Sequence, residues 1–240
     1  MADTDTRGVH ARDAEELQEL QRDGHAPEAP TRRFEVLFGG GGDPLVFGLP
    51  VFVSGSLVLG FALIGLVPIP QSLGSVLAET TFATGLGEFV TALWAIGLGQ
   101  TIVAAIFGLF AAFWFSLFAV LLGGPGPAGG GIGHNWFNVP AASLTPTLQM
   151  FFIAWTIVFV FLTIAILRLP ISYVAIMVFV DIAVLFVLLA ISFTVQVFFV
   201  VAGAAVLAFC AVGLYAFLNT AWVATGAKRA WPPLGPPVIS

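Results

Sequence analysis

One run of sequence, Ala78 to Leu122, restricts the fold of this chain more than any other feature. It holds 45 residues without a lysine, arginine, histidine or proline, and its only acids are Glu79 and Glu88. One helix of that length would be about 67 Å long, whereas a bilayer core of ~30 Å needs only ~20 residues. The run therefore predicts two membrane crossings. The turn between them is best placed at residues 97–100, where two glycines tolerate turn conformations.

The rest of the chain is equally apolar. It is 59% hydrophobic and only 9% charged, with a mean hydropathy of +1.03, which lies outside the range of ordinary soluble domains. We expect an all-α, polytopic membrane protein with a membrane domain at residues 43–222. A polar N-terminal tail with a glycine hinge precedes it at residues 1–42, and a C-terminal tail follows at residues 223–240. The six predicted crossings are residues 49–67, 72–96, 101–122, 148–167, 172–193 and 198–220.

The basic residues support six crossings. Of eight Lys and Arg, five precede the first predicted crossing, Arg168 follows the fourth, and Lys228 and Arg229 follow the sixth. Six crossings place all eight on one side, and the positive-inside rule makes that side cytoplasmic. We therefore expect a multi-pass protein of the plasma (inner) membrane with both termini in the cytoplasm. No apolar segment near the start predicts a cleaved signal peptide.

Two acids lie inside predicted crossings, Glu88 in the second and Asp181 near the middle of the fifth. An acid within the membrane is costly and is interpreted as functional by default. Helical spacing places Glu88 on a small, weakly polar face with Thr81, Thr84 and Thr91, which would pack closely on another helix or line a narrow path. Asp181 has apolar neighbours on its own helix, and no crossing contains a Lys or Arg. For both acids, proton handling and a structural hydrogen bond remain open.

The sequence contains no enzyme signature. It has no His/Cys cluster, no nucleophile elbow and no His–Glu pair within a crossing, so we predict neither a catalytic site, a metal centre nor a cofactor. His134, in the Gly/Pro-rich loop of residues 123–146, is interpreted as a solvated loop histidine. The single cysteine, Cys210, is interpreted as a core residue. No nucleic-acid partner is predicted.

Several short motifs resemble the acetate/succinate–proton symporters of the YaaH/SatP type. Residues 42–49, which include Asp43, Pro44 and Gly48, resemble the Asn-Pro-Ala-Pro-Leu-Gly-Leu signature that opens helix one of that family. The likeness extends over roughly residues 42–220. The other similar segments are residues 99–101 (Gly-Asn-Thr in the family), residues 112–114 (Ser-Phe-Trp), Trp155 in helix four and the helix-five run at residues 184–191.

The resemblance implies a ring-shaped homo-hexamer of six-helix protomers, each with its own pore closed by hydrophobic residues. It places Phe52 at the constriction phenylalanine of helix one and Phe110 at a constriction tyrosine, with Trp114 in the helix-three motif. Glu88 falls at the glutamine of helix two, and Asp181 at a small polar position in helix five. The chain departs from the family where Asp43, Val46, Glu88 and Phe110 replace Asn, Pro, Gln and Tyr.

Three functions follow as hypotheses. The leading one is a proton-linked carrier or channel for a small monocarboxylate such as acetate. Nothing basic in the membrane can hold an anion there, and Glu88 and Asp181 are the only buried groups able to supply a proton. The second is a passive pore for small neutral solutes such as urea, amides or undissociated acids. The third is a non-transporting membrane scaffold whose N-terminal tail recruits a partner, and an intramembrane enzyme is a distant fourth.

Overall fold

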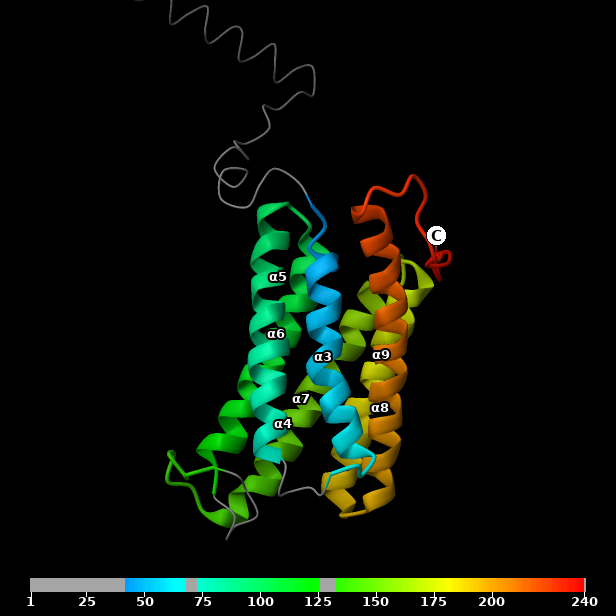
Figure 1. Cartoon of the computed structure of the whole chain (residues 1–240). Coiled ribbons are helices and arrows are strands. Elements are labelled where there is room, and N and C mark those ends of the chain that lie inside the picture. Colours follow the sequence, from blue (N-terminus) through cyan, green and yellow to red (C-terminus); the bar gives the residue numbers. More distant parts are fainter. Residues whose placement is uncertain (1–41, 68–72, 126–132, 240) are drawn as a thin grey trace, which may run out of the picture. The chain divides into compact units, whose positions relative to one another are not determined.

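The computed structural model describes residues 42–67, 73–125 and 133–239, and every element in these ranges is a helix (Figure 1). The predicted N-terminal tail lies outside the described residues except for Gly42. The elements are α3 (Leu45–Leu63), α4 (Leu73–Glu79), the π-helix η1 (Thr80–Gly85), α5 (Leu86–Gly97), α6 (Thr101–Gly123), the 3₁₀ turn η3 (Ala141–Ser143), α7 (Leu144–Ala165), α8 (Ile171–Phe193) and α9 (Gln196–Ala224).

Five spans are long and apolar enough to cross a membrane: α3, α6, α7 together with η3, α8 and α9. They confirm the predicted class of helical, multi-pass membrane protein. The predicted second crossing has a different construction, because α4, η1 and α5 follow one another without a gap and contain 7, 6 and 12 residues. No one of these three elements spans a bilayer by itself, so the count of six crossings stays a prediction.

The tight turn expected in the longest apolar run is present. The helix α5 ends at Gly97 and α6 begins at Thr101. Gly99 has a φ of +70°, a left-handed conformation that only glycine adopts without steric cost from a Cβ atom. The backbone therefore reverses direction within three residues, and α5 and α6 pack along each other as a helical hairpin (Figure 1).

The first helix, α3, is held closely by its neighbours. It packs on α9 along one side and on η1 and α5 along the other. A Cβ atom at Gly48 would lie 2.6 Å from the side chains of Thr91 and Phe107, and one at Gly87 would lie 2.8 Å from Val51. Small residues of this kind let membrane helices approach backbone to backbone. They make α3 and α5 a tight antiparallel pair.

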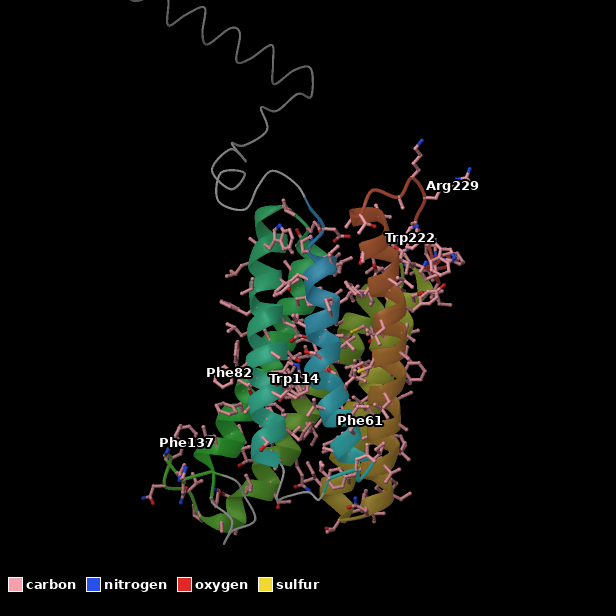
Figure 2. The ribbon with its side chains drawn as sticks, in the orientation of Figure 1. Phe61, Phe82, Trp114, Phe137, Trp222 and Arg229 are labelled. Carbon is pink, nitrogen blue, oxygen red and sulfur yellow. The ribbon has the colours of Figure 1, made fainter. Side chains whose placement is uncertain are left out.

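The C-terminal segment folds back onto the bundle. The amide of Ile171 donates to the Pro236 carbonyl oxygen at 3.0 Å, and the Tyr215 hydroxyl donates to the Pro233 carbonyl oxygen at 2.6 Å. The C-terminus therefore lies at the same end of the bundle as the start of α3 (Figure 1). The basic residues that the structure describes, Arg168, Lys228 and Arg229, are also at this end, where Figure 2 labels Arg229.

Candidate functional site

Two partly open cavities lie within the bundle. The first, of about 130 Å³, lies toward the start of α3 and is lined by α3, α6, the α7–α8 turn and α8. The second, of about 210 Å³, lies toward the other end and is lined by α3, α4, α6, α7, α8 and α9. In the part of the chain that the structure describes, only apolar atoms line them. A chamber with such walls binds water weakly and offers no group that could hold a bare anion.

Phe52 of α3 and Phe110 of α6 are the two residues that line both cavities. Their ring centroids are 5.2 Å apart in an edge-to-face contact. Phe209 of α9 stacks on Phe52 at 5.0 Å, and Phe159 of α7 stacks on Phe110 at 4.8 Å. We call these four rings the aromatic gate, because they separate one cavity from the other.

The structure thus brings together Phe52 and Phe110, the two constriction candidates of the sequence analysis. Sequence reasoning missed Phe159 and Phe209. The chain has 24 phenylalanines, and no spacing rule separates a ring inside the bundle from one facing lipid. The distinction comes from packing, since Phe159 is fully buried whereas Phe82 is 64% exposed.

Trp114 lines the second cavity, and Figure 2 shows it inside the bundle while Phe82 is at the outer edge. Its ring contacts Phe113 of the same helix at 5.0 Å between centroids. Its indole Nε1 is buried, and no described residue accepts a hydrogen bond from it. Trp114 therefore contributes apolar surface to the wall of the second cavity.

Glu88 is completely buried in α5 but lines neither cavity. It lies one turn beyond Thr84 and Gly85, which contact α3 and Trp114 of α6 respectively. Neither carboxyl oxygen has a hydrogen-bond partner among the described residues. A charged carboxylate without a partner is too costly to bury, so this environment fits the protonated acid. The Ser56 hydroxyl of α3 and the Thr81 hydroxyl of η1 are also buried without partners in the described residues.

Asp181 finds its partner on the adjacent helix. The Thr163 hydroxyl of α7 lies 2.7 Å from Asp181 Oδ2 and 3.0 Å from the Phe159 carbonyl oxygen. Asp181 is half-buried and lines neither cavity. The Thr163 hydroxyl has one proton to donate, so a protonated Asp181 that donates to Thr163 leaves that proton free for Phe159. Asp181 is therefore linked to the turn of α7 that carries a ring of the gate.

The signature residues build the start of α3. Asp43 Oδ1 accepts a hydrogen bond from the Leu45 amide at 2.9 Å, and Pro44 is the N-cap residue. A carboxylate at this position caps free backbone amides and interacts favourably with the helix dipole. Gly48 lies where α3 meets Thr91 and Phe107. These three residues position the helix that carries Phe52, and none of them lines a cavity.

The other residues singled out in the sequence do not gather into a second site in the described ranges. These ranges contain no group of three His, Cys, Asp or Glu residues that could hold a metal ion. His134 lies in the loop before η3, with its ring 6.4 Å from that of Trp136. Cys210 is buried in α9 against α3. The candidate site is therefore the pair of cavities and the aromatic gate between them.

The chain was compared with protein families, curated proteins and solved structures. The model of the GPR1/FUN34/yaaH family matches residues 35–231. Among solved structures, the chain is similar to that of the bacterial acetate channel SatP, with a TM-score of 0.67 and 18% sequence identity. The similarity covers 81% of this chain and 99% of that one. At this identity the structural match shows a common fold. No curated protein matches the sequence.

Proposed function

The chain belongs to the GPR1/FUN34/yaaH family, and we propose that it is a membrane transporter or channel for small monocarboxylates such as acetate. The observation that carries the proposal is the pair of apolar cavities divided by Phe52 and Phe110. Such an arrangement is a pathway closed by an apolar constriction, a device that channels use as a gate. The shared fold with a bacterial acetate channel supports acetate as the substrate.

We further propose that the acid passes the gate in its neutral form, so that transport is linked to a proton. The three basic residues described, Arg168, Lys228 and Arg229, are all at the end of the bundle, and the gate is apolar. A carboxylate at the gate would have no counter-charge, whereas the protonated acid needs none. Glu88 lies in α5 and Asp181 in α8, and neither lines a cavity. We propose that each exchanges a proton with the pathway from its position on these helices.

The proposed protomer has six crossings, with α4, η1 and α5 together forming the second. The position of the described basic residues at one end of the bundle supports a cytoplasmic location for that end and for both termini, in the plasma (inner) membrane. The family resemblance supports assembly into a homo-hexamer in which every protomer keeps its own pathway. The bilayer, a small carboxylic acid and a proton are then its partners.

Uptake of radiolabelled acetate into proteoliposomes, with and without an inward proton gradient, tests the proposal. Wild type should show saturable uptake and accumulate acetate when the gradient is applied. Glu88→Gln should lose gradient-driven accumulation by about tenfold or more if Glu88 exchanges the proton. Glu79→Gln, the same change at an exposed residue of α4, is the matched control and should behave as wild type. Absence of saturable acetate uptake by wild type would refute acetate as the substrate.

A passive pore for small neutral solutes is the second candidate, because the walls of both cavities are entirely apolar. Under this alternative, uptake would follow the concentration of the neutral species and stop at equilibrium. Urea and acetamide should then cross as readily as acetic acid, and Glu88→Gln should leave their flux unchanged. Saturable uptake of acetate by a protein that carries neither urea nor acetamide excludes this alternative, whereas accumulation alone does not, because undissociated acetic acid also accumulates as acetate in an alkaline interior.

A further inference from the structure

The side chain of Thr84 in η1 forms hydrogen bonds to the backbone of the neighbouring helix α3. The Gly55 amide donates to Thr84 Oγ1 at 3.1 Å, and the Thr84 hydroxyl donates to the Val51 carbonyl oxygen at 2.9 Å. In a regular α-helix the Gly55 amide would donate directly to that carbonyl, four residues earlier. The Thr84 hydroxyl of η1 therefore bridges the two backbone groups that this bond of the α3 ladder joins.

The local packing fits this insertion. A Cβ atom at Gly55 would collide with the Thr84 hydroxyl and lie 3.0 Å from Thr80 Cα, so the contact requires a glycine. Thr84 is completely buried and lies within the π-helix η1. A π-helix contains one residue more per turn than the α-helix around it and is often found at functional sites. The π-helical turn of η1 and the turn of α3 from Val51 to Gly55 thus meet at the Thr84 hydroxyl.

The turn of α3 that the Thr84 hydroxyl contacts, between Val51 and Gly55, also carries a ring of the aromatic gate. Phe52 follows Val51 directly, and its ring contacts Phe110 and Phe209. A side chain inserted into a helical ladder is a recognised cause of helix bending. The path of α3 past this turn, and with it the position of Phe52, therefore depends on the Thr84 hydroxyl.

A second arrangement is available that leaves no group of this contact without a partner. On withdrawal of Thr84, the Gly55 amide can bond directly to the Val51 carbonyl. The Thr84 hydroxyl can then bond to a carbonyl of its own helix, as Thr91 does to the Gly87 carbonyl oxygen at 2.8 Å. Neither arrangement carries the cost of an unsatisfied buried group. A second arrangement in which every buried polar group is satisfied is what a gate needs in order to move.

We propose that Thr84 is the positioning residue of the aromatic gate: its hydroxyl, inserted between Val51 and Gly55, holds Phe52 in the closed position, and its withdrawal releases the ring. This inference rests on the proposed function, because it assigns Thr84 to the gate of that pathway. Thr84 lines neither cavity, so it acts on the substrate only through Phe52.

Selectivity among acids of different size is the first readout. Fluxes of acetate and butyrate would be measured in proteoliposomes for wild type, Thr84→Val and Thr84→Ser. Thr84→Val keeps the shape but removes the hydroxyl, so the butyrate-to-acetate ratio should rise by about fivefold, the factor that one net hydrogen bond is worth. Thr84→Ser keeps the hydroxyl and should restore the wild-type ratio. Thr91→Val is the matched control, since Thr91 is equally buried but bonds only to its own helix.

The single cysteine supplies a second readout that needs no transport. Cys210 is completely buried in α9 with its sulfur 3.9 Å from the Val53 carbonyl oxygen, beside the same turn of α3. Its rate of labelling by a small methanethiosulfonate would be measured in detergent micelles. The rate should rise several-fold in Thr84→Val and stay at the wild-type value in Thr84→Ser and Thr91→Val.

The two readouts separate this inference from the proposed function. If wild type carries no acetate, the proposed function fails, and Cys210 labelling still decides whether Thr84 holds the turn. If Thr84→Val does not fold, Gly55→Ala replaces it, because its methyl group would expel the Thr84 hydroxyl and should raise the labelling rate equally. Unchanged labelling in Thr84→Val, or an equal rise in Thr91→Val, overturns the inference.

Discussion

Phe52 and Phe110 would decide what passes by excluding charge as well as by excluding size. Moving a lone carboxylate from water into an apolar medium costs on the order of tens of kcal/mol, whereas a neutral hydroxyl costs roughly 2–7 kcal/mol. The aromatic gate offers no polar atom to reduce either cost, since both cavities that meet at the gate have apolar walls throughout the described residues. The neutral acid is therefore favoured by many orders of magnitude over its anion. This difference at two residues is the physical reason to expect that a proton accompanies the substrate.

Replacing Phe52 with alanine should join the two cavities. The change removes a ring that is only 3% exposed and that contacts Phe110 and Phe209. The butyrate-to-acetate flux ratio should rise, and the free energy of unfolding should fall by roughly 3–5 kcal/mol, as for other buried phenylalanines. Phe82→Ala, at an exposed ring away from both cavities, should change neither quantity appreciably. A folded Phe52→Ala with wild-type selectivity would show that the ring is not the barrier.

At the scale of elements, α3 is the helix best suited to move. Pro50 lies inside it and has no amide hydrogen, so the Val46 carbonyl lacks its usual helical donor. Five residues further along the ladder, the Thr84 hydroxyl bridges the Val51 carbonyl oxygen and the Gly55 amide. The ladder of α3 therefore lacks a donor at Val46 and is contacted by a foreign hydroxyl in the turn that carries Phe52. The start of α3 is fixed by the Asp43 cap, so bending would occur beyond it, in the turns that contain Pro50 and Phe52.

The sequence could predict that helices are present, but not all of their ends or the irregular turn within one of them. The first crossing, predicted at residues 49–67, corresponds to α3 (Leu45–Leu63), and the fourth, predicted at residues 148–167, to α7 (Leu144–Ala165). The fifth predicted crossing, residues 172–193, agrees with α8 (Ile171–Phe193), because in lipid the backbone must satisfy its own hydrogen bonds and a helix does so. No sequence pattern of this kind indicates the π-helix Thr80–Gly85. The face assigned to Glu88 assumed regular spacing through Thr81 and Thr84, and the π-turn alters that spacing. Which side chains reach a cavity depends on neighbouring helices, which periodicity in a single helix does not encode.

The link between α7 and α8 can be measured by a double-mutant cycle on Asp181 and Thr163. Their oxygens lie 2.7 Å apart, and the bond joins two helices near the middle of the predicted crossing. Thr163→Val and Asp181→Leu should each destabilise the protein, and their effects should couple by about 0.6 kcal/mol or more, as interhelical hydrogen bonds in membranes do. Unfolding in mixed micelles gives the free energies.

Thr156→Val is the matched control for that cycle. The Thr156 hydroxyl donates to the Phe152 carbonyl oxygen at 2.7 Å, within α7 itself. It should therefore show no coupling to Asp181→Leu. Additive effects of Thr163→Val and Asp181→Leu would show that the bond contributes nothing to the packing of α7 on α8.

At the scale of the whole molecule, the described part of one protomer contains both cavities and the entire aromatic gate. Assembly would therefore not be needed to build the pathway, and the outer surface is free to contact lipid or other copies. The helix α7 has an apolar outer face with helical spacing. Its strongly exposed members are Met150, Ile153, Ile157, Phe161 and Ile164. A face of this kind suits either lipid or a second protomer, and in both cases it requires the surrounding helices to lie in the bilayer.

The direction in which α4, η1 and α5 cross decides the topology of the whole chain, and cysteine labelling can determine it. With six crossings, the turn after α3 and the loop before η3 face the outside, whereas the α7–α8 turn and the C-terminal segment face the cytoplasm. Leu66, His134, Arg168 and Lys228 are exposed representatives of these four regions. Substituted by cysteine in turn, the first two should react in intact cells with a membrane-impermeant maleimide, and the last two only after permeabilisation.

The pair Leu66→Cys and His134→Cys decides the topology, because residues 73–97 and α6 are the helical segments that the structure describes between the two sites. Labelling of both from outside requires that two spans separate them, so the segment with the π-helix must cross the bilayer. Labelling of Leu66→Cys alone would mean that α6 crosses by itself and that α4, η1 and α5 stay on one side. The native Cys210 serves as the background, since it is completely buried and should remain unlabelled in the parent protein.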